Sequence, residues 1–250
     1  MLSLVLTSCV SKKKITYLQN IDEIQNGNSE SYEPKLKPDD LLMIIVSAPD
    51  PSLAALAEPF NLPAIGIINS GNDGLGGGVR YQSYLIDAEG YIDFPVLGKL
   101  KLAGLNKAEA VDFIKSKLDP KYLKDPIINM RINNFKISVL GEVARPGAYS
   151  VGTERITLPE ALALAGDMTI YGNRKNILVV REMEGVKTHA YIDITKADFI
   201  NSPYYYLDQN DLVYVNPNRT KANSSAVGPN ITVGISAISL LITIIALVTR

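Results

Sequence analysis

The chain has few of the residues from which catalytic and metal sites are usually built. Its 250 residues include one cysteine, Cys9, one histidine, His189, and no tryptophan. One cysteine excludes an internal disulfide, and one cysteine with one histidine leaves a zinc site short of ligands. No HExxH or GxSxG pattern occurs, and no nucleophile is paired with a base. We therefore expect no catalytic residue, no metal and no cofactor, and we interpret His189 as structural or exposed.

An excess of one charge is also missing. The 25 basic and 26 acidic side chains give a formal net charge of −1. No basic patch interleaved with aromatic residues is found, so nucleic acid is not an expected partner. No repeat of solenoid period occurs either. Between two apolar ends about 215 residues remain, which is enough for two small domains.

The N-terminal end carries a possible lipidation signal. Residues 1–9 are mostly apolar, and Leu6-Thr7-Ser8-Cys9 matches the bacterial lipobox, in which the cysteine is diacylated. The stretch is short for a signal peptide and has no Lys or Arg before it. The sequence predicts lipidation of Cys9, and the alternative is a chance cysteine. Residues 10–35 read as a polar tether, in which Lys12–Lys14 either touch anionic headgroups or are solvated.

The C-terminal end predicts a transmembrane helix over residues 231–248, after a linker over 219–230. This stretch carries no charge, and a helix of this length is about 27 Å long, close to the thickness of a bilayer's hydrocarbon core. Four hydroxyl residues share one face of that helix and form a hydroxyl seam: Thr232, Ser236, Ser239 and Thr243. The seam indicates either a surface for helix packing or a face toward a wet lumen.

The first folded unit is predicted over residues 36–134. We expect a buried strand over Leu41–Val46, a hairpin around Glu89-Gly90, a helix over Asn106–Leu118 and a strand over Ile127–Ile132. The two strands of that hairpin are Tyr84–Asp87 and Tyr91–Phe94. Residues 61–80 are rich in glycine but lack a Gly-Lys-Ser/Thr motif, which favours a surface loop over a phosphate site.

The second unit is predicted over residues 135–218. Pro146 and Gly147 occupy the central positions of an expected type II turn, with Gly147 at positive φ. The strands on either side are Lys136–Val143 and Ala148–Val151. A helix over Leu158–Ala165 follows, begun by a capping box of Thr157 and Glu160 and ended by Gly166. Four further strands are expected: Ile177–Arg181, His189–Ile194, Tyr204–Leu207 and Leu212–Val215.

This order of elements predicts an α+β fold with the helix packed across a mixed sheet. Tyr204–Tyr206 either stack on sugar rings or pack on a core or interface, and the second reading is favoured. Asp39-Asp40 and the pair Asp208 and Asp211 are better explained as turn formers than as paired catalytic carboxylates.

Two sets of motifs resemble a known family. LKPDDLLMIIV, followed by YLIDAEGYIDFPVLGKLKLAGLNKAEAVDFI, resembles the polysaccharide biosynthesis/export domain of Wza-like outer-membrane polysaccharide export proteins. VLGEVARPGAYSV, ITLPEALALAGDMTIYGNRKNILVVRE and YYLDQNDLVYVNP resemble the β-grasp domain known as SLBB, for soluble ligand-binding β-grasp. The resemblance covers residues 36–217 almost continuously.

The resemblance implies a homo-oligomeric lipoprotein ring that exports capsular or extracellular polysaccharide across the outer membrane, with its soluble domains in the periplasm. It implies polysaccharide as substrate and an inner-membrane polysaccharide co-polymerase as partner. The best-known members carry a second β-grasp repeat, which is not seen here. Their C-terminal helix forms a pore wall, whereas this more apolar helix either lines a pore weakly or only anchors the ring, beside a separate β-barrel.

Two other classes of function stay open. The first is a membrane-anchored periplasmic adaptor that binds glycan or a partner protein without conducting. The second is an enzyme acting on polysaccharide, against which the lack of a catalytic constellation argues.

Overall fold

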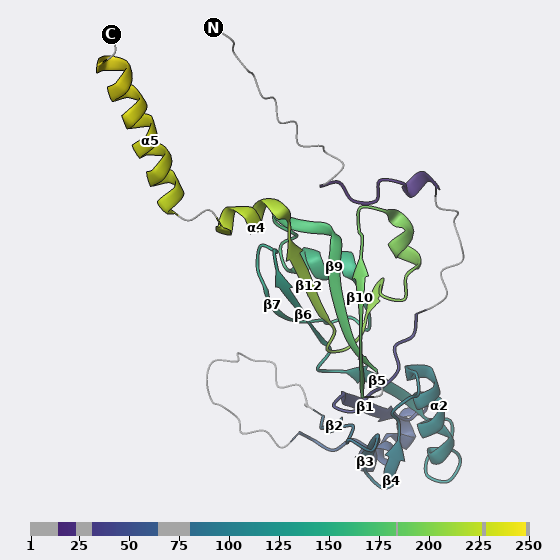
Figure 1. Ribbon diagram of the computed structural model, residues 1–250. Helices are drawn as coiled ribbons and strands as arrows, with labels where there is room; N and C mark the ends of the chain where they lie inside the picture. Colours follow the sequence, from purple (N-terminus) through teal and green to yellow (C-terminus); the bar gives the residue numbers. More distant parts are fainter. Residues whose placement is uncertain (1–14, 24–31, 65–80, 184, 227–228, 249–250) are drawn as a thin grey trace.

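The structure is a computed structural model that describes residues 15–23, 32–64, 81–183, 185–226 and 229–248 (Figure 1). Within α4 and α5, the side chains of residues 225, 226, 229–233 and 235 are also not described. The predicted lipidation site Cys9, and most of the glycine-rich stretch at 61–80, lie outside the described residues. The described residues pack around two separate hydrophobic cores, one for each of two domains.

The first domain is built on a three-stranded antiparallel sheet in the order β2-β1-β5. Its strands are β1 (Leu41–Ser47), β2 (Ser83–Leu85) and β5 (Ile127–Ile132), and a second ladder pairs β3 (Tyr91–Phe94) with β4 (Gly98–Lys101). Short helical turns follow β1: η3 (Pro51–Leu53), α1 (Ala54–Ala57) and η4 (Glu58–Phe60).

Helix α2 (Lys107–Leu118) covers this sheet and is closed at its start by side-chain caps. The predicted capping box is confirmed: the Asn106 side chain accepts from the Glu109 amide, and the Glu109 carboxylate accepts from the Asn106 amide, both at 2.8 Å. Ala110, Ile114 and Leu118 recur every four residues and are fully buried against the sheet. The helix is therefore fixed by its cap and by one apolar stripe.

The predicted hairpin around Glu89-Gly90 is wrong in its pairing, although both of its strands exist. Strand β2 pairs with β1 instead, and β3 pairs with β4. Gly90 makes a tight turn at φ +89°, but the ladder does not continue from it. Alternation of apolar residues shows which side chains face a core and leaves the partner strand open.

The second domain contains a five-stranded mixed sheet in the order β10-β9-β12-β6-β7. Its strands are β6 (Lys136–Gly141), β7 (Gly147–Ser150), β9 (Gly172–Met183), β10 (Val186–Ile192) and β12 (Leu212–Pro217). Only the β6–β12 pair is parallel. A small antiparallel ladder pairs β8 (Ile156–Thr157), directly before α3, with β11 (Tyr206–Leu207), directly before β12.

Helix α3 (Leu158–Leu164) packs on one face of this sheet, as predicted. Its buried residues Leu158, Ala161 and Leu162 join the core formed by the inward side chains of β6, β9 and β12. Its capping box is present, with the Thr157 hydroxyl accepting from the Glu160 amide at 3.3 Å. A short 3-10 helix, η5 (Ala197–Asn201), lies between β10 and β11.

The expected positive φ of Gly147 is wrong. Pro146 and Gly147 do join β6 to β7, but Gly147 already lies in the β7 ladder, opposite Val139, and is absent from the left-handed residues. The glycine that adopts a left-handed backbone conformation in this region is Gly141, at φ +88°. A Cβ there would overlap the carbonyl oxygen of Val215, because β6 and β12 approach closely at that point.

Part of the expected polar tether is docked on the second domain. Leu18 and Gln19 donate backbone hydrogen bonds to the carbonyls of Ile194 and Thr195, at 3.2 and 2.8 Å. The Tyr17 ring packs against the same core, and its hydroxyl donates to Asp167 at 2.7 Å. A short 3-10 turn, η2 (Ile21–Glu23), follows. The polar composition of this segment predicted a tether, yet a few apolar contacts and its backbone hydrogen bonds hold it to the second domain.

Two helices, α4 (Arg219–Ala226) and α5 (Pro229–Val248), follow β12. The predicted transmembrane helix is wrong: among the described residues, no helix is long and apolar enough to cross a membrane. A spanning helix needs about 20 predominantly apolar residues. The apolar part of α5 is interrupted by Gly234 and by the hydroxyl residues Ser236, Ser239 and Thr243.

Candidate functional site

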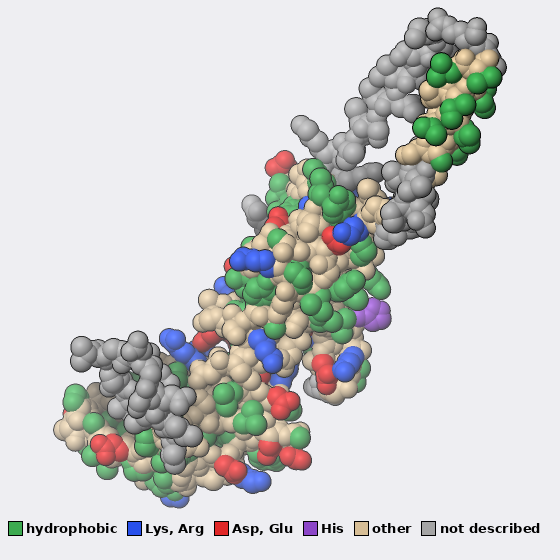
Figure 2. All heavy atoms as spheres, turned by 90° about the vertical axis from the view of Figure 1, so that its left-hand side faces the viewer, with side chains coloured by type: hydrophobic (Ala, Val, Ile, Leu, Met, Phe, Trp, Pro, Cys, Tyr) green, Lys and Arg blue, Asp and Glu red, His purple; other side chains and the backbone are tan. Residues whose placement is uncertain are grey.

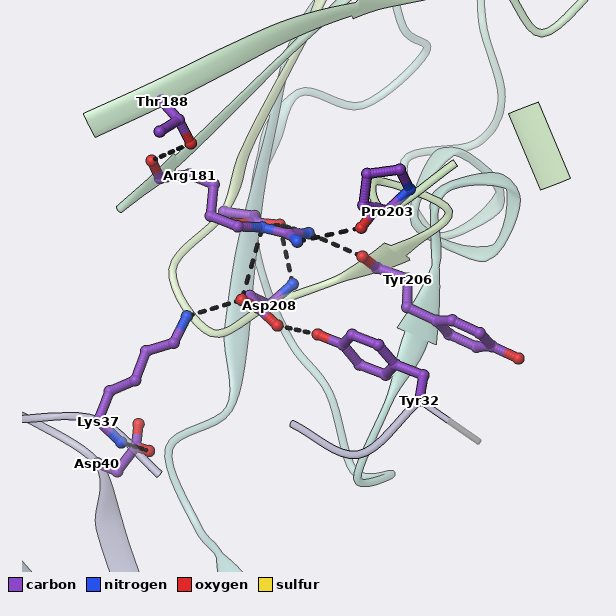
Figure 3. A network of polar contacts seen from close by, with 9 residues as sticks. Tyr32, Lys37, Asp40, Arg181, Thr188, Pro203, Tyr206 and Asp208 are labelled. Atoms are coloured by element: carbon purple, nitrogen blue, oxygen red, sulfur yellow. Dashed lines mark hydrogen bonds and ion pairs between the residues drawn. The ribbon is translucent and has the colours of Figure 1, made fainter. Parts of the chain in front are cut away.

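A buried cluster of charged groups joins the two domains (Figure 3). Lys37 and Asp40 come from the segment just before β1, Arg181 comes from β9, and Asp208 and Asp211 come from the turn before β12. We call these five residues, together with Tyr32, the interdomain junction. Lys37 and Asp208, which form an ion pair between the two domains, are 171 residues apart in the sequence.

Arg181 and Asp211 form the centre of the junction. The guanidinium donates through Nε and Nη2 to the Asp211 carboxylate, at 3.1 and 2.7 Å, and the Asp211 side chain is fully buried. Arg181 also donates to the carbonyls of Pro203 and Tyr206. This bidentate pair satisfies both partners, which burial of a charge requires.

Asp208 links this centre to the first domain. Its Oδ2 accepts from the Lys37 ammonium at 2.8 Å and lies 3.5 Å from Arg181, while its Oδ1 accepts from the Tyr32 hydroxyl. The Tyr32 ring stacks on Tyr206, with centroids 4.8 Å apart. The segment that leads into β1 is thus held to the second domain by charge and by ring contact together.

The junction holds three carboxylates and two cations, so one negative charge is in excess. Burial, and then the charge of Asp211, raises the pKa of Asp208 to about 7. Burial raises the pKa of Asp40 to about 6, against the opposing effect of a hydrogen bond from the Lys37 amide at 2.8 Å. Burial also lowers the pKa of Lys37. The cluster therefore favours uptake of a proton near neutral pH.

A groove of about 1010 Å³ lies beside the junction, between the two domains. Strand β5 and helix α2 form one wall, and residues 151–155 form the other. Lys107 and Glu154 make an exposed ion pair across it. Six charged side chains line the groove, with a formal net charge of zero: Glu33, Lys107, Asp112, Arg131, Glu154 and Arg155. The groove is large enough for a small organic ligand and offers apolar walls with a polar rim.

Comparison with known proteins gives a family match for each of the two domains. Residues 28–133 match the model of the polysaccharide biosynthesis/export protein, and residues 135–215 match that of the SLBB domain. The chain therefore carries a polysaccharide biosynthesis/export domain followed by an SLBB domain. The junction and the groove therefore lie between an export domain and an SLBB domain. The matched export domain indicates a transport component, in line with the prediction that the chain is not an enzyme.

Two curated relatives match part of this chain, both described as EPS I polysaccharide export outer membrane protein EpsA. The protein of Ralstonia nicotianae is 33% identical over 110 residues, which is 42% of this chain and 29% of the relative. The protein of Ralstonia solanacearum is 34% identical over 102 residues, which is 39% of this chain and 27% of the relative. This chain thus matches less than a third of the length of either relative.

The residues singled out from the sequence do not meet in one place. His189 is exposed on β10, and the turn at Pro146 and Gly147 joins β6 to β7 of the SLBB domain. In the hydroxyl seam on α5, the Thr243 hydroxyl donates back to the Ser239 carbonyl at 2.9 Å, and the Thr232 side chain lies outside the described residues. Packing of this seam against another helix stays a prediction.

The aspartates and tyrosines singled out from the sequence do take part in contacts within the fold. Asp208 and Asp211 do form a turn, since the Asp208 amide donates to the Asp211 carboxylate at 2.8 Å, but they also bind Arg181. Tyr204 and Tyr205 pack against the SLBB core, in line with the favoured reading. Sequence reasoning missed Arg181, although a signal exists: it falls on the inward register of Ile177 and Val179, where an apolar residue is expected.

Proposed function

We propose that this chain is a component of a polysaccharide export apparatus, acting as a homo-oligomeric ring that lets capsular or extracellular polysaccharide leave the periplasm across the outer membrane. The observation that carries the proposal is the pair of matched domains in family order, 28–133 and 135–215. The buried junction supports it, because a conduit wall needs its two domains held at a fixed angle. An inner-membrane polysaccharide co-polymerase is the proposed partner on the other side of the periplasm.

Loss and restoration of the chain in the cell that produces the polymer would test this role. Cells that lack the chain should synthesise the polymer and retain it, and restoring the full chain should return polymer to the medium or the cell surface. A polymer yield and location that do not change on removal would contradict a role in export.

The mass of the full chain in mild detergent tests the ring. Light scattering should report one closed oligomer of several chains. A strict monomer at micromolar concentration would contradict the ring, whatever the cell assay shows.

Anchoring at the outer membrane through Cys9 is part of the same proposal. The lipobox Leu6-Thr7-Ser8-Cys9 supports it. The full-length precursor should incorporate labelled palmitate, and Cys9→Ala should lose the label. Equal labelling of the two proteins would exclude lipidation at this residue.

A membrane-anchored adaptor that binds glycan without conducting is the second candidate, and the groove between the domains favours it. Its neutral balance of charges and its apolar walls suit an uncharged sugar chain. Calorimetric titration with neutral oligosaccharides should then give binding that Arg131→Ala weakens. Binding together with a monomeric mass would favour the adaptor over the ring.

A further inference from the structure

The middle of the outer face of the SLBB sheet is largely apolar, and it is uncovered among the described residues. Helix α3 and the core occupy the inner face, where Ile137, Val139, Ile177, Val179, Val213 and Val215 are all fully buried. Side chains alternate along each strand, so their neighbours point outward. In the part of the chain that is described, no element packs over those neighbours, and Figure 2 shows hydrophobic side chains gathered on this part of the surface.

The register of the strands aligns these outward residues in two rows. One row is Tyr191, Leu178, Tyr214 and Leu140, across β10, β9, β12 and β6. The other row is His189, Val180, Leu212, Ser138 and Ala148, across all five strands. Neither row contains Asp, Glu, Lys or Arg. Both rows run out to the edge at β10, where Tyr191 is 60% exposed.

Both edges of the sheet are open over the lengths of their strands. Strand β10 pairs only with β9, and β7 pairs only with β6, within the described residues. No described backbone group outside those ladders bonds to residues 186–192 or 147–150. The two strands lie at opposite edges of the sheet (Figure 1). Strand β7 carries no charge or proline of the kind that blocks pairing at an edge.

The directions of the strands make the two edges complementary. Strand β10 is antiparallel to β9, β9 to β12, and β7 to β6, while β12 and β6 are parallel. Strands β10 and β7 therefore run in opposite directions. A second copy that keeps the same orientation, as copies in a ring about an axis along the strands do, brings its β7 antiparallel to β10 of the first.

We propose that β10 of one copy pairs with β7 of the next, so that the SLBB sheets join edge to edge around the oligomer. The occupant of each edge is thus a second copy of this chain. The contact is heterologous, because it uses two different edges, and a heterologous contact closes into a ring when its rotation allows. It also continues the row that crosses all five strands from one copy to the next. This inference rests on the proposed ring and names the surface that forms it.

Disulfide trapping in the full chain tests the pairing. All trapping variants carry Cys9→Ser, and cysteines replace outward, exposed residues at each edge: Lys187, His189 or Tyr191 on β10 and Ala148 or Ser150 on β7. Variants with one cysteine on each edge should form a ladder of covalent multimers on mild oxidation, for at least one choice of positions. A matched control pairs His189→Cys with Lys101→Cys, which lies on β4 of the export domain and should give no ladder.

The outcomes separate this inference from the proposed ring. A ladder that needs both cysteines supports it. Dimers from His189→Cys alone would indicate a two-fold contact through β10 and overturn it. An oligomer by light scattering with no ladder at any pair of positions would overturn the edge contact while leaving the ring in place. A monomeric mass together with no ladder would overturn both.

Discussion

Val180 and Arg181 are neighbours on β9, yet the apolar residue faces outward and the charged one is buried. This reverses the usual distribution of side chains. On the inner face, the Arg181 guanidinium is bound by groups of the same chain, namely Asp211, Asp208 and two backbone carbonyls. Outside, Val180 belongs to an apolar face that the described chain leaves uncovered. The junction thus ties the two domains of one chain together, whereas the open face and its edges are suited to contact with another chain.

Removal of the junction's central cation should have the largest effect. Arg181→Met leaves the Asp211 carboxylate buried without its partner, and breaking a buried pair in this way costs about 3–5 kcal/mol. Urea unfolding of the variant, compared with Arg155→Met as an exposed arginine control, would measure it. A loss no larger than that of the control would show that the junction contributes little.

Gly141 should be the next most sensitive position, because it completes the contact between β6 and β12. In Gly141→Ala the new Cβ meets the Val215 carbonyl oxygen and the residue keeps a left-handed φ, so we expect a loss of at least about 2 kcal/mol. Gly147→Ala is the control, since a Cβ there has no neighbour within 4 Å. Similar unfolding midpoints for the two variants would contradict this account of the turn.

Stability should fall as pH rises through the junction's titration. The folded pKa of Asp208 is raised from 3.8 to about 7, so the folded state holds a proton that the unfolded state has released. Stability from this group is full below pH 4 and is lost as pH rises toward 7. One pKa unit corresponds to about 1.4 kcal/mol, so a shift of about three units sets an upper bound of roughly 4 kcal/mol on the fall.

Urea midpoints between pH 4 and pH 8 measure this dependence. Asp208→Asn should flatten the part of the profile near pH 7, whereas Glu89→Gln, an exposed carboxylate in a turn, should leave it as it is. A profile for Asp208→Asn that matches the parent would assign the dependence to other groups.

The exposed ion pair across the groove should matter least. Lys107 and Glu154 also join the two domains, but their side chains are 46% and 57% exposed, and such pairs contribute about 0–1 kcal/mol. Lys107→Ala should therefore shift the unfolding midpoint only slightly. A loss comparable to that of Arg181→Met would remove the distinction between a buried junction and a solvated contact.

Features determined by neighbouring residues could be predicted from the sequence. Strand β5 has the predicted bounds, and both capping boxes are present, because a cap involves groups only three residues apart. Strand pairing was harder to predict. Tyr84 alternates as a strand residue should, but nothing in the alternation indicates that it faces Leu42 of β1.

The junction could be predicted only in part. Asp208 and Asp211 were identified as a turn because their spacing is local, and the turn exists. Lys37, the partner of Asp208, lies 171 residues away in the sequence, so no local pattern connects the two. The membrane span predicted over residues 231–248 failed for a different reason: among the described residues, no helix is long and apolar enough to cross a membrane.

Cryo-electron microscopy of the full chain in mild detergent tests the central claim most directly, since the ring and the junction would be seen together. The account predicts closed rings in which neighbouring SLBB sheets meet at their edges and each export domain keeps its junction with its own SLBB domain. Single-chain particles only, at concentrations where the chain is folded, would contradict it.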